Sequence, residues 1–246
     1  LFTVDSCRPD RFSLHGNARD TTPNIDSWAK GAVVYDNAFS VSSWTAPGLV
    51  SILTGLYPWQ HGVDSRDRMV RPSTQTLPKV FRQAGYAVPN LNFFTFVSYY
   101  QGLGLGEIER EYFTDKDGDE LLKWLDRNGQ QRFFVWYHTT TVHQPYNPPG
   151  GGASAEDSEG IAAVKRGAIV PKGSVKFVPS DRPVLLDLYD AEIENMDRFF
   201  GAVLAKLREK DLLDNTVIVL SADHGEELLE HGFVGHASTS LEAHLR

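Results

Sequence analysis

The sequence has a single cysteine, Cys7, among its 246 residues. One cysteine excludes an internal disulfide framework and says little about the compartment. No stretch approaches the roughly 20 apolar residues that a membrane span requires, and no run rich in Lys or Arg is present. The net charge of −8 adds to these absences, so a nucleic acid or an anionic membrane surface is not the expected partner.

What is present is the composition of a globular protein, with 41% hydrophobic and 23% charged residues. A chain of this length can bury one sizeable core. Residue 1 already lies within an apolar, strand-like run, so no signal peptide or anchor can be read. The sequence therefore leaves the localisation and the oligomeric state unassigned.

Strand-like and helical patterns alternate along the chain. Apolar runs predict strands at 1–5, 32–38, 86–93, 132–137 and 216–221, and helical spacing predicts helices at 23–30, 47–54, 76–84, 117–127, 182–209 and 239–245. This alternation predicts an α/β domain over 1–246, with a mainly parallel sheet and helices on both faces. The stretch 147–180 is rich in Gly, Ser and charge, and we interpret it as a mobile insertion beside the active site.

The most informative motif is the pair Asp223-His224, which is separated from the predicted strand 216–221 by Ala222 alone. Open α/β sheets bind ligands at the carboxyl ends of their strands. A carboxylate and an imidazole side by side can form half of a divalent-metal site. The alternative for the pair alone is ordinary turn chemistry.

Two other segments are suitable partners for this pair. Asp5 ends the predicted strand 1–5, and Thr45 precedes Pro47 and a short apolar helix that Gly55 can end. A hydroxyl at a helix N-terminus lies among free N–H groups, which suits an arriving anion. The alternative for Thr45 is a simple N-cap.

These segments, with several others in the same order, resemble the sulfatase family of the alkaline phosphatase superfamily. The resemblance rests on Val4-Asp5-Ser6-x-Arg8-x-Asp10, Thr22-Pro23-Asn24-Ile25-Asp26, Trp44-Thr45-Ala46-Pro47, His143-Gln144-Pro145-Tyr146, Asp223-His224-Gly225-Glu226 and Glu230-His231-Gly232-Phe233-x-Gly235-His236. It implies an alkaline phosphatase-like fold. Family members continue beyond the last motif, so we expect an incomplete catalytic domain.

The resemblance also implies roles for particular residues. Asp5, Asp223 and His224 match the ligands of one divalent metal ion. Thr45 matches the nucleophile, and His143 matches a histidine near the leaving-group oxygen. His236 stands where many relatives have a lysine that contacts the anionic oxygens of the substrate.

The metal implied by the resemblance is one Mn, Zn, Mg or Ca ion. Many relatives have a second Asp where this chain has Ser6, which favours Mn, Zn or Mg over Ca. The second-metal ligands of two-zinc phosphatases have no obvious match. The Lys-x-x-His that follows Gly-Tyr in sulfatases is also missing, and Asn92 or Thr95 is a weak substitute. Family motifs include residues similar to three further histidines, but capping of turns or support of the ligands explains these equally well: His61, His138 and His231.

The chain departs from sulfatases proper at position 45. Those enzymes convert a Cys or Ser within Cys/Ser-x-Pro-x-Arg to formylglycine. Here the nucleophile position is Thr45 and the arginine is replaced by Leu49. Threonine cannot give that aldehyde, and in this place it resembles the phosphodiesterases and phospho-group transferases of the superfamily.

The leading hypothesis is a metal-dependent hydrolase of a small-molecule phosphate, phosphonate or sulfate ester, with a covalent Thr45 intermediate and a preference for phosphodiester-type substrates. One alternative is a phospho-group transferase in which an alcohol replaces water. The other is an inactive sulfatase-like binding module. The retention of all six matched polar side chains favours an enzyme over the binding module.

Overall fold

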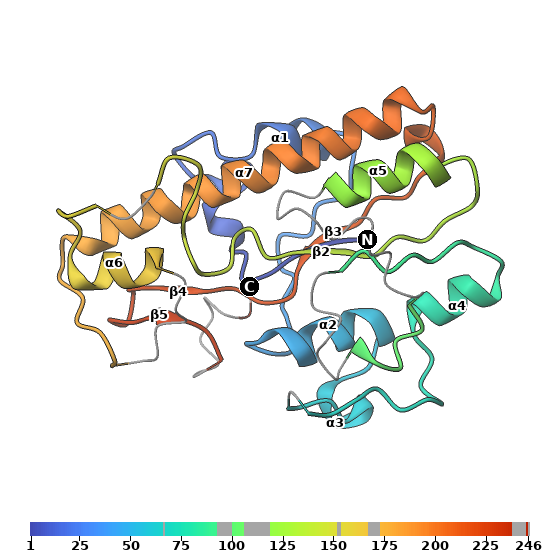
Figure 1. Ribbon diagram of the computed structural model, residues 1–246, viewed down its shortest axis with the longest axis horizontal. Helices are drawn as coiled ribbons and strands as arrows, with labels where there is room; N and C mark the ends of the chain where they lie inside the picture. The colour runs from blue at the N-terminus through green and yellow to red at the C-terminus, as the bar shows by residue number, and fades with distance from the viewer. Residues whose placement is uncertain are drawn as a thin grey trace.

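A parallel sheet lies at the centre of the molecule (Figure 1). The structure is a computed structural model that describes residues 1–65, 67–92, 100–105, 119–151, 154–166, 173–237 and 245. Within these residues the central strand β1 (Phe2–Val4) pairs in parallel with β2 (Tyr137–Thr139) and β3 (Leu220–Ala222). The register aligns Phe2 with both Tyr137 and Leu220. The carboxyl ends of all three strands therefore meet at one edge.

Helices cover both faces of this sheet, with α1, α5 and α7 on one face and α2, α3 and α4 on the other (Figure 1). The α-helices are α1 (Pro23–Ala29), α2 (Thr45–Thr54), α3 (Pro58–His61), α4 (Leu77–Gln83), α5 (Asp119–Asn128), α6 (Glu159–Lys165) and α7 (Asp181–Glu209). A small antiparallel pair, β4 (Glu227–Leu228) and β5 (Val234–Gly235), follows β3. The predicted α/β architecture is confirmed.

The long helix α7 forms because its apolar residues recur at helical spacing. They all lie in the buried core: Leu185, Leu188, Ile193, Met196, Phe200, Val203 and Leu207. Phe200 meets Phe2 of β1 edge-on, with ring centroids 5.4 Å apart. Asp197 accepts hydrogen bonds from the backbone N–H groups of Asn24 and Ile25 at the start of α1. Through these contacts α7 fixes both the central strand and α1.

Helix α2 belongs to a second cluster of buried apolar residues on the other face. It ends at Gly55, whose φ of 69° is the left-handed conformation typical of a helix C-terminus. In its first turn, Gly48 lies so close to Asp223 that a Cβ would stand 2.7 Å from the Asp223 carbonyl oxygen. A glycine here lets the start of α2 approach the end of β3.

The strands are shorter than predicted. Within the predicted strand 86–93, the described residues form isolated bridges rather than a continuous strand, one of them between Ala87 and Phe133. The predicted strand 32–38 is irregular, and its Val33 and Tyr35 are 79% and 77% exposed. The sequence pattern identified apolar character, but in the described residues this segment has no neighbouring strand to pair with.

The observed helices agree with the predicted ones more closely than the strands do, although the sequence analysis did not predict α3 and α6. Helix α6 lies inside the predicted insertion 147–180 and buries Ile161 and Val164; the mobility of this segment stays a prediction. The predicted helix 239–245 lies outside the described residues except at position 245. No helix in the described part of the chain combines the length and apolar character of a membrane span.

Candidate active site

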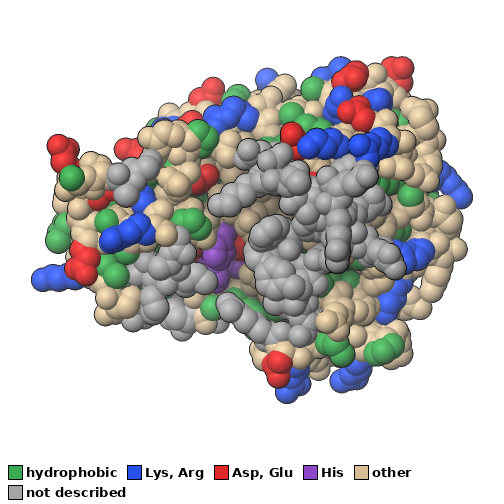
Figure 2. Space-filling model, viewed as in Figure 1, with side chains coloured by type: hydrophobic (Ala, Val, Ile, Leu, Met, Phe, Trp, Pro, Cys, Tyr) green, Lys and Arg blue, Asp and Glu red, His purple; other side chains and the backbone are tan. Residues whose placement is uncertain are grey.

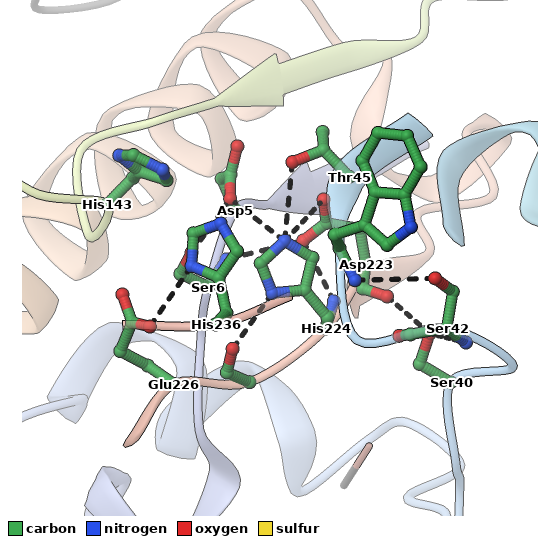
Figure 3. Close-up of polar contacts among 12 residues, drawn as sticks. Asp5, Ser6, Ser40, Ser42, Thr45, His143, Asp223, His224, Glu226 and His236 are labelled. Carbon is green, nitrogen blue, oxygen red and sulfur yellow. Dashed lines mark hydrogen bonds and ion pairs between the residues drawn. The ribbon is translucent and has the colours of Figure 1, made fainter. Parts of the chain in front are cut away.

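Three residues proposed as metal ligands meet at the carboxyl edge of the sheet (Figure 3). Asp5 follows β1, while Asp223 and His224 follow β3. The parallel register of the two strands brings their ends together. All three side chains are buried, and one potential ligand atom from each lies within 4.8 Å of the others.

The hydroxyl of Thr45, the first residue of α2, reaches the same point. Its Oγ1 lies 3.3 Å from His224 Nε2. Asp5 Oδ1 and Asp223 Oδ2 lie 3.4 Å and 3.5 Å from that nitrogen. Three oxygen atoms therefore surround a single imidazole nitrogen.

The protonation of His224 decides what this arrangement can hold. Its Nδ1 lies 2.8 Å from the Gly225 carbonyl oxygen, which only accepts hydrogen bonds, so Nδ1 carries the proton. Burial lowers the pKa of His224 to about 4, so the ring is neutral at pH 7 and Nε2 presents a lone pair. That lone pair faces carboxylate oxygens. A cation is the group that fits among them.

The two carboxyl groups give a second sign of a cation site. Asp223 Oδ2 is buried and accepts no hydrogen bond from the described residues. Burial, and next the charge of Asp5, raise the pKa of Asp223 well above its usual range. Burial also opposes ionisation of Asp5, but neighbouring histidines, His143 foremost, outweigh it and hold the pKa of Asp5 well below its usual range. A divalent ion would let both groups ionise, and carboxylate with imidazole suits zinc or manganese.

Two more histidines complete a cluster beside these residues. The His143 and His236 rings are 5.1 Å apart, and the His236 and His224 rings are 4.4 Å apart. His143 Nδ1 lies 2.6 Å from the Gln144 carbonyl oxygen and therefore donates its proton there. Its Nε2 is left to exchange a proton with a ligand. Figure 2 shows histidine side chains at the surface near the middle of one face of the molecule.

Glu226 is a site residue to which the sequence analysis gave no role. Its buried carboxylate lies 3.0 Å from His236 Nδ1 and accepts a hydrogen bond of 3.1 Å from the Tyr146 hydroxyl. The carboxylate holds the Nδ1 proton of His236 and thereby fixes the orientation of its ring. The sequence feature that could have identified Glu226 is its position two residues after His224 in the Asp-His-Gly-Glu motif.

Ser6, at the position where many relatives have a second aspartate, points into the site and contacts both carboxylates. Its Oγ donates to Asp5 Oδ1 at 2.9 Å, and its backbone N–H donates to Asp223 Oδ1 at 3.3 Å. Ser6 has a φ of 58°, uncommon for a residue with a side chain. The Tyr189 hydroxyl donates to its carbonyl oxygen at 2.6 Å and fixes this turn.

The weaker sequence candidates lie elsewhere or serve the backbone. His61 contacts the Ser51 hydroxyl between α2 and α3, and the exposed His231 pairs with Glu227. The Asn92 amide bonds to backbone atoms of β2 and the residue before it. Thr95 lies outside the described residues. His138 contacts Asp5 through Nε2, at 3.4 Å from Oδ2.

Comparisons with known proteins agree on one family. The Sulfatase family model matches residues 1–246. An ulvan-active sulfatase of Formosa agariphila is 25% identical over 259 residues, which cover 87% of this chain and 41% of the relative. Phosphonate monoester hydrolase of Agrobacterium radiobacter has a TM-score of 0.75 at 18% identity, covering 99% of this chain and 65% of that one. The C-terminal periplasmic domain of EptC from Escherichia coli, solved in complex with zinc, has a TM-score of 0.62 at 17% identity, covering 96% and 67%.

The chain spans between 30% and 55% of the length of the curated relatives compared. The structural neighbours share its fold at low sequence identity. The family model, in contrast, matches from the first residue to the last. The chain therefore belongs to the sulfatase family.

Proposed function

We propose that the protein is a metal-dependent hydrolase of phosphate, phosphonate or sulfate esters that uses Thr45 as its nucleophile. One observation carries the proposal: Thr45 Oγ1, Asp5 Oδ1 and Asp223 Oδ2 all lie within 3.3–3.5 Å of His224 Nε2. Asp5, Asp223 and His224 would hold one divalent ion, zinc or manganese in preference to calcium. The ion would lower the pKa of the Thr45 hydroxyl and offset charge that develops on the ester.

The residues of the site support a two-step displacement. In the first step Thr45 Oγ, having lost its proton to solvent, bonds to phosphorus as the bond to the leaving oxygen breaks. His143 gives that oxygen a proton from Nε2. In the second step water bonds to phosphorus, loses a proton to His143, and the bond between phosphorus and Thr45 breaks. His236 contacts the non-bridging oxygens, with its ring held by Glu226.

We propose phosphodiester-type or phosphonate esters as better substrates than aryl sulfates. Threonine cannot form the aldehyde hydrate by which sulfatases with formylglycine release sulfate. A sulfate ester on Thr45 would be stable and would block turnover. A phosphoryl group on Thr45 can be released by attack of water at phosphorus.

Substitution of Thr45 tests the nucleophile. In the full-length, zinc-loaded protein we expect Thr45→Ala to lower kcat by at least about 100-fold, because the attacking atom is absent. Thr45→Ser keeps the hydroxyl and should retain measurable turnover. Circular dichroism and bound zinc, measured on both variants, separate loss of the nucleophile from loss of fold or metal. More than a few per cent of wild-type turnover in Thr45→Ala would refute the covalent route.

The same preparation distinguishes the alternatives. A bis-aryl phosphate, an aryl phosphonate and an aryl sulfate are compared by kcat/KM, and products are analysed with and without an added alcohol. Efficient multiple-turnover cleavage of the sulfate would overturn the phosphorus preference. A product esterified to the alcohol in place of free phosphate would indicate a transferase. Zinc binding without turnover of any ester would indicate a binding module.

A further inference from the structure

A buried chain of hydrogen bonds leads from Trp136 to the Oδ2 atom of Asp5. Trp136 Nε1 donates to Thr3 Oγ1 at 2.9 Å. The same Thr3 oxygen lies 2.9 Å from His138 Nδ1, and His138 Nε2 lies 3.4 Å from Asp5 Oδ2. All four residues are at least 95% buried. The β1–β2 register, which places Thr3 beside His138, creates this chain.

Trp136, at the start of this chain of hydrogen bonds, determines which atom donates at each contact. An indole N–H can only donate, so Thr3 Oγ1 accepts at that contact. The single proton of Thr3 can then go to His138 Nδ1 at 2.9 Å or to the Tyr137 carbonyl oxygen at 3.5 Å. The contact to His138 is the hydrogen bond, because its 2.9 Å is shorter than the 3.5 Å of its competitor for the same proton. His138 Nδ1 is therefore an acceptor, and in the neutral ring the proton sits on Nε2, facing Asp5.

The two oxygens of Asp5 consequently have different surroundings. Oδ2 faces His138, whereas Oδ1 faces Ser6 Oγ at 2.9 Å and His224 Nε2 at 3.4 Å. His138 is not among the residues whose ligand atoms cluster within 4.8 Å in the described part of the chain. A donor on Oδ2 opposes rotation of the carboxylate and keeps Oδ1 turned to Asp223 and His224.

We infer that His138 is a positioning residue that Thr3 holds in its Nε2–H tautomer so that Asp5 presents one oxygen to the metal. The inference rests on the proposed metal site. It gives a role to the two residues that carry no chemistry themselves, Thr3 and Trp136. It also predicts that zinc affinity depends on a hydroxyl two residues before the ligand.

The test uses Thr3→Val, which removes the hydroxyl with little change of shape, and Thr3→Ser as the matched control that keeps it. The zinc-free protein at pH 8 gives the ring ¹⁵N chemical shifts of His138, and chelator competition gives the zinc dissociation constant. We expect Nε2–H in the wild type and in Thr3→Ser. In Thr3→Val we expect a mixture of tautomers and zinc binding weaker by about tenfold, the loss typical of partners outside the ligand shell.

A second pair of variants covers a failure of Thr3→Val to fold, which is a risk because Trp136 Nε1 would lose its acceptor. His138→Gln keeps an N–H donor and should bind zinc within about threefold of wild type, while His138→Leu should lose about tenfold. A wild-type His138 protonated on Nδ1 would overturn the inference. So would wild-type zinc affinity in Thr3→Val or in His138→Leu.

Neither readout requires a substrate, so the inference and the proposed function can fail separately. Zinc affinity that depends on Thr3, in a protein that cleaves no ester, would refute the hydrolase and leave the role of His138 standing. Ester cleavage by a protein whose zinc affinity does not change on substitution of Thr3 or His138 would support the hydrolase and refute the role of His138. A wild-type protein that binds neither zinc nor manganese would overturn both.

Discussion

Replacing Gly48 with alanine tests how closely α2 must approach Asp223, one of the proposed metal ligands. The added Cβ would stand 2.7 Å from the Asp223 carbonyl oxygen, whereas ordinary contacts begin at 3.4 Å. The close-packed interior cannot absorb this overlap, so α2 and Asp223 must separate by about 0.7 Å. Overpacking costs about 1–3 kcal/mol, and the better helix propensity of alanine offsets about 1 kcal/mol of it. We expect the free energy of unfolding to fall by about 0–2 kcal/mol.

The larger effect falls on the site, because Thr45 and Asp223 move apart. A misplacement of about 1 Å can cost about 100-fold in rate, so we expect kcat/KM and zinc affinity to fall about 10- to 100-fold. Chelator competition and ester hydrolysis by the full-length protein measure the two. Gly31→Ala is the matched control, because its Cβ would be 4.0 Å from the nearest atom, the Trp28 carbonyl oxygen. A Gly48→Ala protein with wild-type zinc affinity and kcat/KM would refute the reasoning.

Two further predictions concern charge. Asp223→Asn should raise the unfolding midpoint of the zinc-free protein by about 2–4 °C, the shift for ~1 kcal/mol gained when a buried acid that also repels Asp5 becomes a neutral amide, and abolish stabilisation by zinc; a lower midpoint in calorimetry would contradict this. Burial would raise the pKa of Glu230, but Arg8 at 3.0 Å outweighs it and lowers the pKa to about 2. Because the pKa is lower in the folded protein, the ionised Glu230 stabilises the fold at pH values above its unfolded-state pKa of 4.5. This stabilisation is lost as the pH falls towards 2. Glu230→Gln should therefore lessen the acid loss of stability in urea unfolding between about pH 5 and pH 3, by about 1–2 kcal/mol: the roughly 1.5 pH units from 4.5 to 3 set a limit of ~2 kcal/mol, which solvent screening reduces; an unchanged pH profile would exclude this role.

The sequence predicted the features that depend on local pattern. Helical spacing located α7 within one residue at its start, because a helix that covers a sheet must bury one stripe. The convergence of Asp5, Asp223 and His224 followed from the parallel sheet, since carboxyl ends of parallel strands share an edge. Their roles as ligands, and that of Thr45 as nucleophile, stay predictions.

The sequence could not reveal contacts that depend on register. Glu226 meets His236 because the antiparallel β4–β5 pair aligns Glu227 with Gly235 and folds the flanking residues together. The contact between Thr3 and His138 depends on the pairing of β1 with β2 in the same way. An apolar pattern also does not show whether a neighbouring strand is present to pair with. For this reason the prediction of a strand at 32–38 was wrong.

The pairing of β1 with β3 has a consequence for biogenesis. The N–H of Ser6 and the carboxylate of Asp223, which bond to each other, are 217 residues apart in the sequence. Parallel strands so distant in the chain pair late, because the entropy of closing the loop is lost before contacts compensate. At ribosomal rates of about 5–20 residues per second, roughly 10–40 seconds separate the synthesis of the two halves. Until β3 is made, β1 has β2 on one side only, and its other edge has no strand to pair with.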